Sequence, residues 1–363
     1  MKHPQTEQTP PTIRDIAERV GVHKATVAAV LNGGRSTARV SEATRTRIFA
    51  AAEDLRYVPN AMARGLKMVR FRSLGLVFNY PDPAWITVDQ YGINLLFGII
   101  TEASAHGYNV THFHKTWGDG SPQAAAGFRG QGIDGFLAIA PRLGSGIVSS
   151  LTELGVPLAV VSAAPEIPGI PHVLLDNACG IRLAMQHLFA LGHRRIAYLT
   201  SAMDQYDAVE RRNEYIRSMA EAGAPILPGY LVDVDCVPGE PRRWGGPGDQ
   251  FITDTAYHEA QRVLRLSQPP TAIVTSGASA EAVIYAAQAF GARVPQDLSV
   301  VGFDDTPGAG YVRLTTIRQP LRDMGRCAAQ LLISALEREP ITTLANIFQP
   351  ELVKRESTAP PAC

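Results

Sequence analysis

Cysteines are few in this chain, and no long hydrophobic run is present. The 363 residues include four cysteines, none in a CxxC spacing, which argues against a disulfide framework and a zinc site. Apolar runs such as Phe136–Ile139 and Leu158–Val161 are far shorter than the ~20 residues that span a bilayer. The N-terminal MKHPQTEQTPPT lacks the apolar core of a secretory signal. We therefore expect a soluble, cytoplasmic protein without a metal or other cofactor.

Motifs of the common enzyme classes are also missing. The sequence contains no GxSxG, HExxH or P-loop motif, and no GxGxxG at a strand–helix turn. The histidines show no metal-ligand spacing apart from His112 and His114, which would share one face of a strand. Acidic residues such as Asp304 and Asp305 fit strand ends and turns better than a catalytic pair. The sequence therefore does not predict an enzyme.

Net charge is absent too, but the charges are unevenly distributed. The whole chain has 34 basic and 34 acidic side chains. Residues 1–70 have twelve basic and six acidic ones, a net charge of +6, and the remainder carries −6. Such an asymmetry is expected where one module contacts phosphate, although an ordinary solvated surface is the alternative. The length also exceeds what one hydrophobic core usually serves, which predicts at least two domains.

The N-terminal part has three short helical patterns. Thr12 precedes IRDIAERV, with Asp15 at the acidic position of a capping box. Gly21 ends this run, HKATVAAVLN follows, and a third pattern begins at Ser41. Two short helices joined by a tight glycine turn and braced by a third are typical of a helix-turn-helix module, whose second helix enters the DNA major groove. A generic three-helix bundle is the alternative.

From about residue 72 the patterns of strands and helices alternate. SLGLVFNY, GIDGFLAIA, RIAYLTS and LSVVGFDD have the composition of buried strands, and amphipathic helical stretches separate them. The pattern repeats from about residue 176, which predicts two parallel sheets covered by helices. The expected fold class is therefore α/β, with an N-terminal all-α head and a two-lobed parallel α/β body. Ligands of such bodies bind between the halves, at the carboxyl ends of the strands.

The motifs in both parts resemble the lactose/galactose-repressor (LacI/GalR) family. TIRDIAERVGVHKATVAAVLN, VSEATRTRI and YVPNAMARGL match its head and hinge, and LLFGI, GIDGFLAIA, LLDNACGIRLAMQHLFALGHRRIAYL, RVPQDLSVVGFDD and LTTIRQP match its periplasmic-binding-protein-like effector domain in order. The resemblance extends from about residue 12 to Arg355. It implies a homodimeric, allosteric repressor that binds roughly palindromic double-stranded operator DNA at the nucleoid, responds to a small-molecule effector and does not contact membranes.

The resemblance also implies which residues contact DNA. Lys24, Ala25 and Ala29 occupy the base-reading positions, and Lys24 is the hydrogen-bonding reader among them. Arginine is common where Ala29 stands, and the loop after the second helix is longer than usual, so we expect an operator unlike the family's common one. The full expected set is Thr12, His23, Lys24, Ala25, Thr26, Ala29, Asn32, Asn60, Ala63 and Leu66.

A hinge helix is implied between head and body. In the family, this helix becomes ordered on DNA and inserts a leucine into the minor groove, and Leu66 matches that leucine. Pro59 can begin a helix, and Gly65 makes an isolated one marginal. A flexible linker is the alternative.

We expect the following domain boundaries. Residues 1–58 form the head, 59–71 the hinge helix and linker, and 72–356 the effector-binding and dimerisation domain. This domain divides into sub-domains of about 72–175 with 318–348, and 176–317 with 349–356. Residues 357–363 form a tail too short for a tetramerisation helix.

The family's ligand positions fall on six residues of this chain, namely Tyr91, Ser162, Arg211, Phe251, Ser276 and Asp304. An arginine and an aspartate presented together suit vicinal hydroxyls, and aromatic rings stack on a ligand ring. The chain departs from the pattern at Ser276-Gly277 and Glu214, and has extra residues at Asp82–Gln90 and Pro238–Asp249. A sugar is the leading expectation. A nucleobase or nucleoside effector, or a sugar-binding protein without DNA function, are the alternatives.

Overall fold

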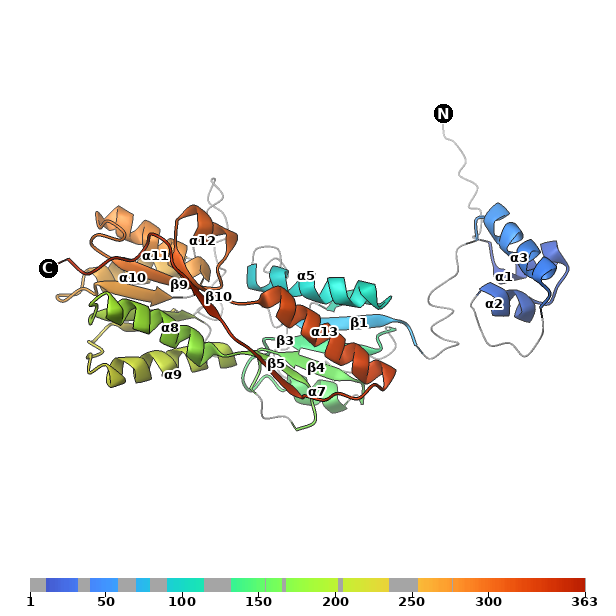
Figure 1. The fold of residues 1–363 in the computed structure, drawn as a ribbon, viewed down its shortest axis with the longest axis horizontal. Coiled ribbons are helices and arrows are strands. Elements are labelled where there is room, and N and C mark those ends of the chain that lie inside the picture. The colour runs from blue at the N-terminus through green and yellow to red at the C-terminus, as the bar shows by residue number, and fades with distance from the viewer. Residues whose placement is uncertain are drawn as a thin grey trace, which may run out of the picture. The chain divides into compact units, whose positions relative to one another are not determined.

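The computed structural model divides into two compact units, Met1–Phe71 and Arg72–Cys363 (Figure 1). Each unit has its own hydrophobic core. The residues that the structure describes are 11–31, 40–57, 70–78, 90–113, 132–153, 155–164, 168–201, 205–234, 254–275 and 277–362.

The first unit contains α1 (Ile13–Val20), α2 (Lys24–Leu31) and α3 (Glu42–Asp54). Helix α1 begins at Thr12, whose backbone N–H donates to Oδ2 of Asp15 at 2.7 Å, as expected of a capping residue. It ends at Gly21, which has a φ of 72°. Glycine adopts this left-handed conformation without a steric penalty, so the chain turns sharply into α2.

Helix α3 braces the other two helices. Ile48 on α3 packs with Ile16 and Val27 in a core closed to solvent. The Arg47 guanidinium donates to the carbonyl of Val20 at 2.7 Å, which satisfies an acceptor at the end of α1. The first unit therefore has the three-helix arrangement expected of a helix-turn-helix module.

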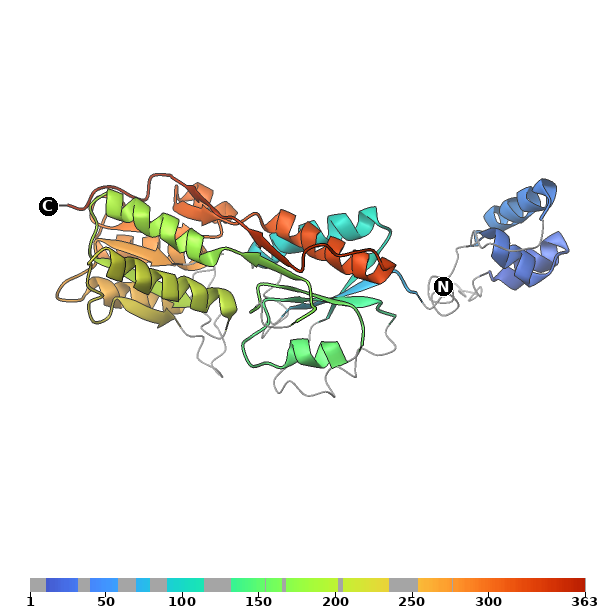
Figure 2. The same ribbon diagram turned by 60° about the horizontal axis from the view of Figure 1, so that its bottom comes forward.

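The second unit consists of two lobes, each built on a six-stranded sheet (Figures 1 and 2). The first sheet has the order β11-β5-β4-β3-β1-β2, and the second has the order β12-β10-β9-β8-β6-β7. The described strand pairs are parallel except β10 with β12. The first lobe comprises β1 (Ser73–Phe78), α5 (Gln90–Ala105), β2 (Asn109–Phe113), β3 (Gly135–Ile139), α7 (Ile147–Glu153), β4 (Leu158–Val161), β5 (His172–Leu175), α13 (Leu321–Glu337) and β11 (Ala345–Phe348). The second lobe comprises α8 (Asn177–Ala190), β6 (Ile196–Ser201), α9 (Tyr206–Glu221), β7 (Leu231–Val234), α10 (Asp254–Leu264), β8 (Ala272–Thr275), α11 (Gly277–Phe290), β9 (Ser299–Phe303), α12 (Pro307–Tyr311), β10 (Thr315–Arg318) and β12 (Glu351–Val353).

Three segments cross between the lobes. They join β5 to α8, β10 to α13, and β11 to β12. Helix α13 thus returns to the first lobe, where it packs on α5. A Cβ at Gly98 of α5 would lie 2.1 Å from the carbonyl oxygen of Arg322, and one at Gly325 of α13 would lie 2.2 Å from that of Leu95. Only glycine permits this close approach.

The sheets place the carboxyl ends of their strands toward the lobe junction, as parallel sheets with helical crossovers require. Strands β1, β3, β4 and β9 are buried throughout, so they read as continuous apolar runs. Within the described residues, none of the helices has the length and apolar character needed to cross a membrane.

Candidate functional site

The outer face of α2 carries the residues expected to read DNA bases. Lys24 and Ala25 are exposed and Ala29 is half-buried, whereas Val27 and Val30 on the opposite side are buried in the core. The residues expected at the phosphate backbone lie nearby, with His23 exposed and Thr26 half-buried.

Two of the expected DNA-contacting residues also stabilise helix starts. Nδ1 of His23 accepts from the backbone N–H of Ala25 at 3.3 Å, which satisfies a donor at the start of α2. The Thr12 hydroxyl donates to Asp15 at 2.8 Å and is exposed. These hydrogen bonds lower the pKa of Asp15, the backbone N–H of Thr12 contributing most.

The basic side chains around this face differ in whether an acidic residue already pairs with them or leaves them available to contact DNA. Arg14 pairs with Glu18 at 3.0 Å and Arg19 with Asp54 at 3.1 Å. Lys24 forms no ion pair with any residue that the structure describes, so its ammonium is available to a phosphate or a base edge. Four expected DNA-contacting residues, Asn32, Asn60, Ala63 and Leu66, lie outside the described residues.

A polar cluster lies where the two lobes of the second unit meet, and Arg211 is at its centre. Nε of Arg211 donates to Oδ1 of Asn177 at 2.7 Å, and the guanidinium lies 3.8 Å from the ring centroid of Phe303. Its terminal Nη groups donate to none of the described residues. Arg211 is thus oriented by two contacts and keeps its fork of donors for another molecule.

Asp207 lies one helical turn before Arg211 and is buried. Burial raises the pKa of this carboxyl, opposed by Arg211 and by hydrogen bonds with Ser162 and Asn177. Ser162 belongs to the first lobe, has a φ of 54° and lies 2.7 Å from the hydroxyl of Tyr91. The contact between Ser162 and Asp207 therefore connects the lobes.

Asp304 follows β9 and lies in the electrostatic neighbourhood of Asp207. Its Oδ1 accepts from Nε2 of Gln319, and its backbone N–H donates to the carbonyl of Ile317 at 2.8 Å. These contacts place Asp304 and Gln319 together at the carboxyl edge of the second sheet.

Three buried polar atoms in this region have no hydrogen-bond partner among the residues that the structure describes, namely Oδ1 of Asp207, Oε1 of Gln319 and Oγ1 of Thr275. Buried polar atoms in native proteins are nearly always paired with protein, water or ligand. Two of these atoms can only accept hydrogen bonds, and they accompany the unused donors of Arg211. The cluster is therefore suited to a molecule that both donates and accepts.

The structure brings Tyr91, Ser162, Arg211 and Asp304 into one cluster, whereas Phe251 and Ser276 lie outside the described residues. The extra residues at 82–89 and 238–249 also lie outside them. Glu214 does not join the cluster. Its buried side chain pairs with Arg217 and lies 3.9 Å from Arg182 on α8.

The sequence reasoning missed four members of the cluster, which are Asn177, Asp207, Phe303 and Gln319. Asp207 carried a usable signal, because it precedes Arg211 by four residues and so shares its helix face. Asn177 and Phe303 adjoin strand ends of the predicted sheets, a position that favours ligand contact. Gln319 carried no distinguishing signal beyond following a strand.

Three family models match the chain in succession. Residues 12–60 match bacterial regulatory proteins of the lacI family. Residues 72–234 match the periplasmic binding proteins and sugar binding domain of the LacI family, and residues 185–358 match a periplasmic binding protein-like domain.

Individual proteins are similar over nearly the whole chain. The HTH-type transcriptional repressor PurR of Salmonella typhimurium is 29% identical over 355 residues, which cover 96% of this chain and 97% of PurR. A complex of the transcriptional regulator CelR with cellobiose has 26% identity and a TM-score of 0.70, covering 96% of this chain and 99% of CelR. A lac repressor dimer bound to operator and the anti-inducer ONPF has 23% identity and a TM-score of 0.81. The match covers 97% of this chain and 100% of the lac repressor chain. The expected fold class, a helical head with a two-lobed α/β body, is confirmed.

Proposed function

Because this chain belongs to the LacI family of bacterial regulatory proteins, we propose that it is a repressor whose affinity for operator DNA is controlled by a sugar bound between the two lobes. The family comprises DNA-binding transcriptional regulators with a ligand-binding domain, not enzymes. The name of PurR as a repressor supports the direction of control. The polar cluster at the lobe junction supports the place of the ligand.

We assign DNA contact to the outer face of α2 and to the hinge. Lys24, Ala25 and Ala29 would read bases, and Thr12, His23 and Thr26 would contact the backbone together with Asn32. Asn60, Ala63 and Leu66 would act in the hinge helix within residues 59–71, following a head of residues 1–58. Two observations support this assignment, namely the exposure of the α2 face and the lack of an ion pair between Lys24 and any described residue.

The DNA-binding proposal is tested by a salt titration on a DNA site selected from a random pool. Phosphate contacts release counterions, so affinity should fall steeply between low and physiological salt. Lys24→Ala should weaken binding to the selected site by about 1–3 kcal/mol relative to a mismatched site. Arg14→Ala, which removes an exposed cation paired with Glu18, is the matched control. A salt-independent affinity would exclude operator binding by this head.

The unpaired atoms around Arg211 carry the proposal of a sugar. A hydroxyl group donates and accepts at once, so vicinal hydroxyls can pair with the Arg211 fork and with the unpartnered Oδ1 of Asp207 together. Asp304 and Gln319 extend the same polar surface. CelR, a 26% identical neighbour, was solved with cellobiose, which adds support for a carbohydrate. Phe251 and Ser276 are proposed as further contacts.

A thermal-shift screen tests the ligand class. Purified protein is heated with mono- and disaccharides, cellobiose among them, and separately with nucleobases and nucleosides. A ligand at 100 times its Kd stabilises the folded state by about 2.7 kcal/mol, which such a screen resolves. A shift with sugars alone supports the proposal. A shift with nucleobases or nucleosides alone would replace the sugar by the alternative class, and a flat screen in both panels would exclude both classes.

A homodimer completes the proposal, since paired heads would read a roughly palindromic operator. The outer face of α5 exposes Phe97 by 56% and Ile100 by 42%, three residues apart on one helix face, and Tyr311 of α12 is 89% exposed. Large exposed apolar side chains of this kind mark association surfaces. Sedimentation equilibrium should show a dimer for the native chain and a monomer for Phe97→Glu, and a native monomer would remove the dimer from the proposal.

A further inference from the structure

Two consecutive aspartates with left-handed backbone follow β9. Asp304 has a φ of 86° and Asp305 a φ of 48°. Such conformations are uncommon for residues other than glycine and persist when the surroundings hold them in place. The two side chains engage adjacent residues at the end of β10, because Asp304 accepts from Gln319 and Asp305 from Arg318. A residue of the candidate ligand site is thus the direct chain neighbour of an ion-paired residue.

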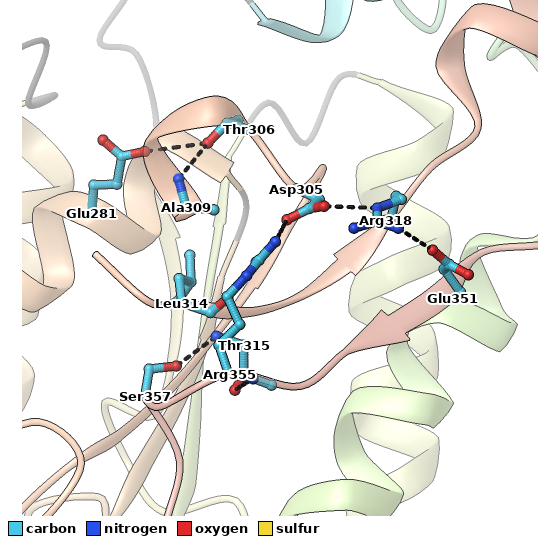
Figure 3. Close-up of polar contacts among 10 residues, drawn as sticks. All are labelled: Glu281, Asp305, Thr306, Ala309, Leu314, Thr315, Arg318, Glu351, Arg355 and Ser357. Carbon is cyan, nitrogen blue, oxygen red and sulfur yellow. Dashed lines mark hydrogen bonds and ion pairs between the residues drawn. The ribbon is translucent and has the colours of Figure 1, made fainter. Parts of the chain in front are cut away.

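Asp305 is the centre of a network of four charged side chains (Figure 3). Nε of Arg318 donates to Oδ2 of Asp305 at 2.7 Å, and Nη1 of Arg318 donates to Oε1 of Glu351 at 2.5 Å. From the other side, Nη2 of Arg355 lies 2.7 Å from Oδ1 of Asp305. We call these four residues the Asp305 network.

The surrounding hydrogen bonds fix the network to the second lobe. Arg355 also donates through Nη1 to the carbonyl of Leu314 at 2.7 Å. Beyond the turn, Thr306 accepts from the backbone N–H of Ala309 at 3.3 Å and donates to Glu281 at 3.2 Å, which anchors the start of α12 (Figure 3). The turn is therefore held on both sides by contacts within one lobe.

The network lies at the points where two of the crossovers meet the second lobe. Arg318 is the last residue of β10 before the crossover to α13, and Glu351 is the first residue of β12 after the crossover from β11. The two residues are also opposite each other in the antiparallel pairing of these strands. The network therefore joins two of the three crossovers at the residues where they meet the second lobe.

The ion pairs of the network differ in burial, and therefore in how strongly solvent weakens them. The Asp305 side chain is 9% exposed and that of Arg355 is 19% exposed, whereas Glu351 is 62% exposed. Solvent and salt screen the pair of Arg318 with Glu351 most and that of Asp305 with Arg355 least, while the Arg318 side chain, 47% exposed, is partly screened in its contact with Asp305. Loss of one arginine would leave a largely buried carboxylate with half its partners.

We propose that the Asp305 network holds Arg318 and Glu351 in fixed positions, so that both residues move with the second lobe as one rigid body. The pivots of lobe movement are then Gln319–Pro320 and Gln349–Pro350. Gln319 lies in one pivot and binds Asp304, so a ligand that competes for Asp304 acts directly on a crossover. This last step rests on the proposed ligand site, whereas the anchoring itself does not.

Hydrogen–deuterium exchange of the full-length protein without ligand tests the anchoring. Asp305→Asn and Arg318→Met should speed exchange in peptides covering 315–320 and 348–353 by about tenfold, which equals about 1.4 kcal/mol of local stability. Exchange at the third crossover, residues 172–178, and in β8 should stay at the native rate. Arg318→Lys keeps the positive charge beside Asp305, so it should restore slow exchange across 315–320 but not across 348–353.

Glu356→Gln is the matched control, because it breaks an exposed ion pair with Arg313 in the same lobe but off the crossovers. Native exchange rates at 315–320 and 348–353 in Arg318→Met would overturn the proposal, and so would acceleration spread evenly over the second lobe. Either result leaves the proposal of a sugar ligand unaffected. Conversely, if no ligand shifts the melting temperature but the exchange pattern is as expected, the anchoring holds and only the proposed action of a ligand on the crossover through Asp304 is removed.

Discussion

The guanidinium of Arg211 lies 3.8 Å from the ring centroid of Phe303, so a side chain of α9 is held against the last residue of β9. Phe303 is itself fixed by Gly180, where a Cβ would lie 2.8 Å from the ring. A cation over an aromatic face is attracted by the ring quadrupole, and the contact leaves the in-plane donors of the arginine available. The cluster is thus oriented before any ligand arrives.

Arg211→Ala should abolish the rise in melting temperature caused by the sugar that is identified in the screen. Charge-assisted hydrogen bonds contribute about 1.5–3 kcal/mol each, so affinity should fall by at least about tenfold. Binding to selected DNA without sugar should stay native, because the head is a separate unit. Asn213→Ala, two residues along α9 and exposed, is the control. An undiminished sugar shift in Arg211→Ala would remove Arg211 from the site.

Asp207→Asn should stabilise the ligand-free protein at pH 7. Burial raises the pKa of Asp207, so the fold favours its protonated form. Its contribution to stability is full below the ordinary aspartate pKa of about 3.9 and is lost as the pH rises through the raised value. The asparagine variant should therefore melt higher at pH 7 by a few degrees, ~1 kcal/mol being worth ~2–4 °C in domains of this size, and by less near pH 4.

Differential scanning calorimetry at pH 4, 5.5 and 7 measures this difference. Asp323→Asn, which alters an exposed carboxylate paired with Arg326, is the control and should show no comparable rise. A variant that is less stable than the native chain at pH 7 would show that Asp207 is held as a stabilising carboxylate.

Gly21→Ala should loosen the first unit through backbone strain alone. Gly21 has a φ of 72°, and a Cβ there would meet nothing within 4 Å. A left-handed conformation costs an L-residue about 1–2 kcal/mol, equivalent to about 5–30-fold in a local opening equilibrium. Amide exchange in α1 and α2 should accelerate accordingly. Gly21→Asn should do less, since asparagine tolerates this conformation, and equal effects of both variants would contradict backbone strain as the cause.

Acid should release the C-terminal tail from the second lobe. Nε2 of His193 lies 2.8 Å from the carbonyl oxygen of Ala359, and its Nδ1 lies 2.8 Å from the hydroxyl of Thr271. The carbonyl requires a proton on Nε2, so Nδ1 carries the lone pair of the neutral ring, and the Thr271 hydroxyl beside it also donates to the carbonyl of Arg195 at 3.2 Å. Burial lowers the pKa of His193, opposed in part by its hydrogen bond to the carbonyl of Ala359. Burial, Lys354 and His193 lower the pKa of His187, which contacts Thr358 at 2.9 Å.

The sign of this effect follows from the lowered pKa values. The stabilisation is complete above the unfolded histidine pKa of about 6.5 and is lost as the pH falls through the folded values. Exchange of residues 357–362, corrected for intrinsic chemistry, should therefore be faster at pH 5 than at pH 7.5. His193→Gln should reduce this pH dependence, and His106→Gln, an exposed histidine of the first lobe, should leave it unchanged. The same corrected rate at both pH values would contradict the prediction.

Several features were predictable because their causes are local. The cap at Thr12 and the turn at Gly21 depend on residues a few positions apart, and both occur as expected. The alternation of apolar strands with amphipathic helices likewise predicted the two-lobed fold. Arg211 and Asp304 were found through a resemblance of motifs, not through any property of the residues alone.

Periodicity, caps and composition are local properties of the chain, and they suffice to specify the helix-turn-helix head, the parallel two-lobed body and the separation of a basic head from an acidic remainder. Long-range contacts of the folded chain bring Asp207 and Asn177 to Arg211, pair Gln319 with Asp304, and place Asp305 between Arg318 and Arg355. These residues come from strand ends and helix starts far apart in the chain. Strand order and crossover geometry bring these residues together, and no local stretch of the sequence predicts either of them.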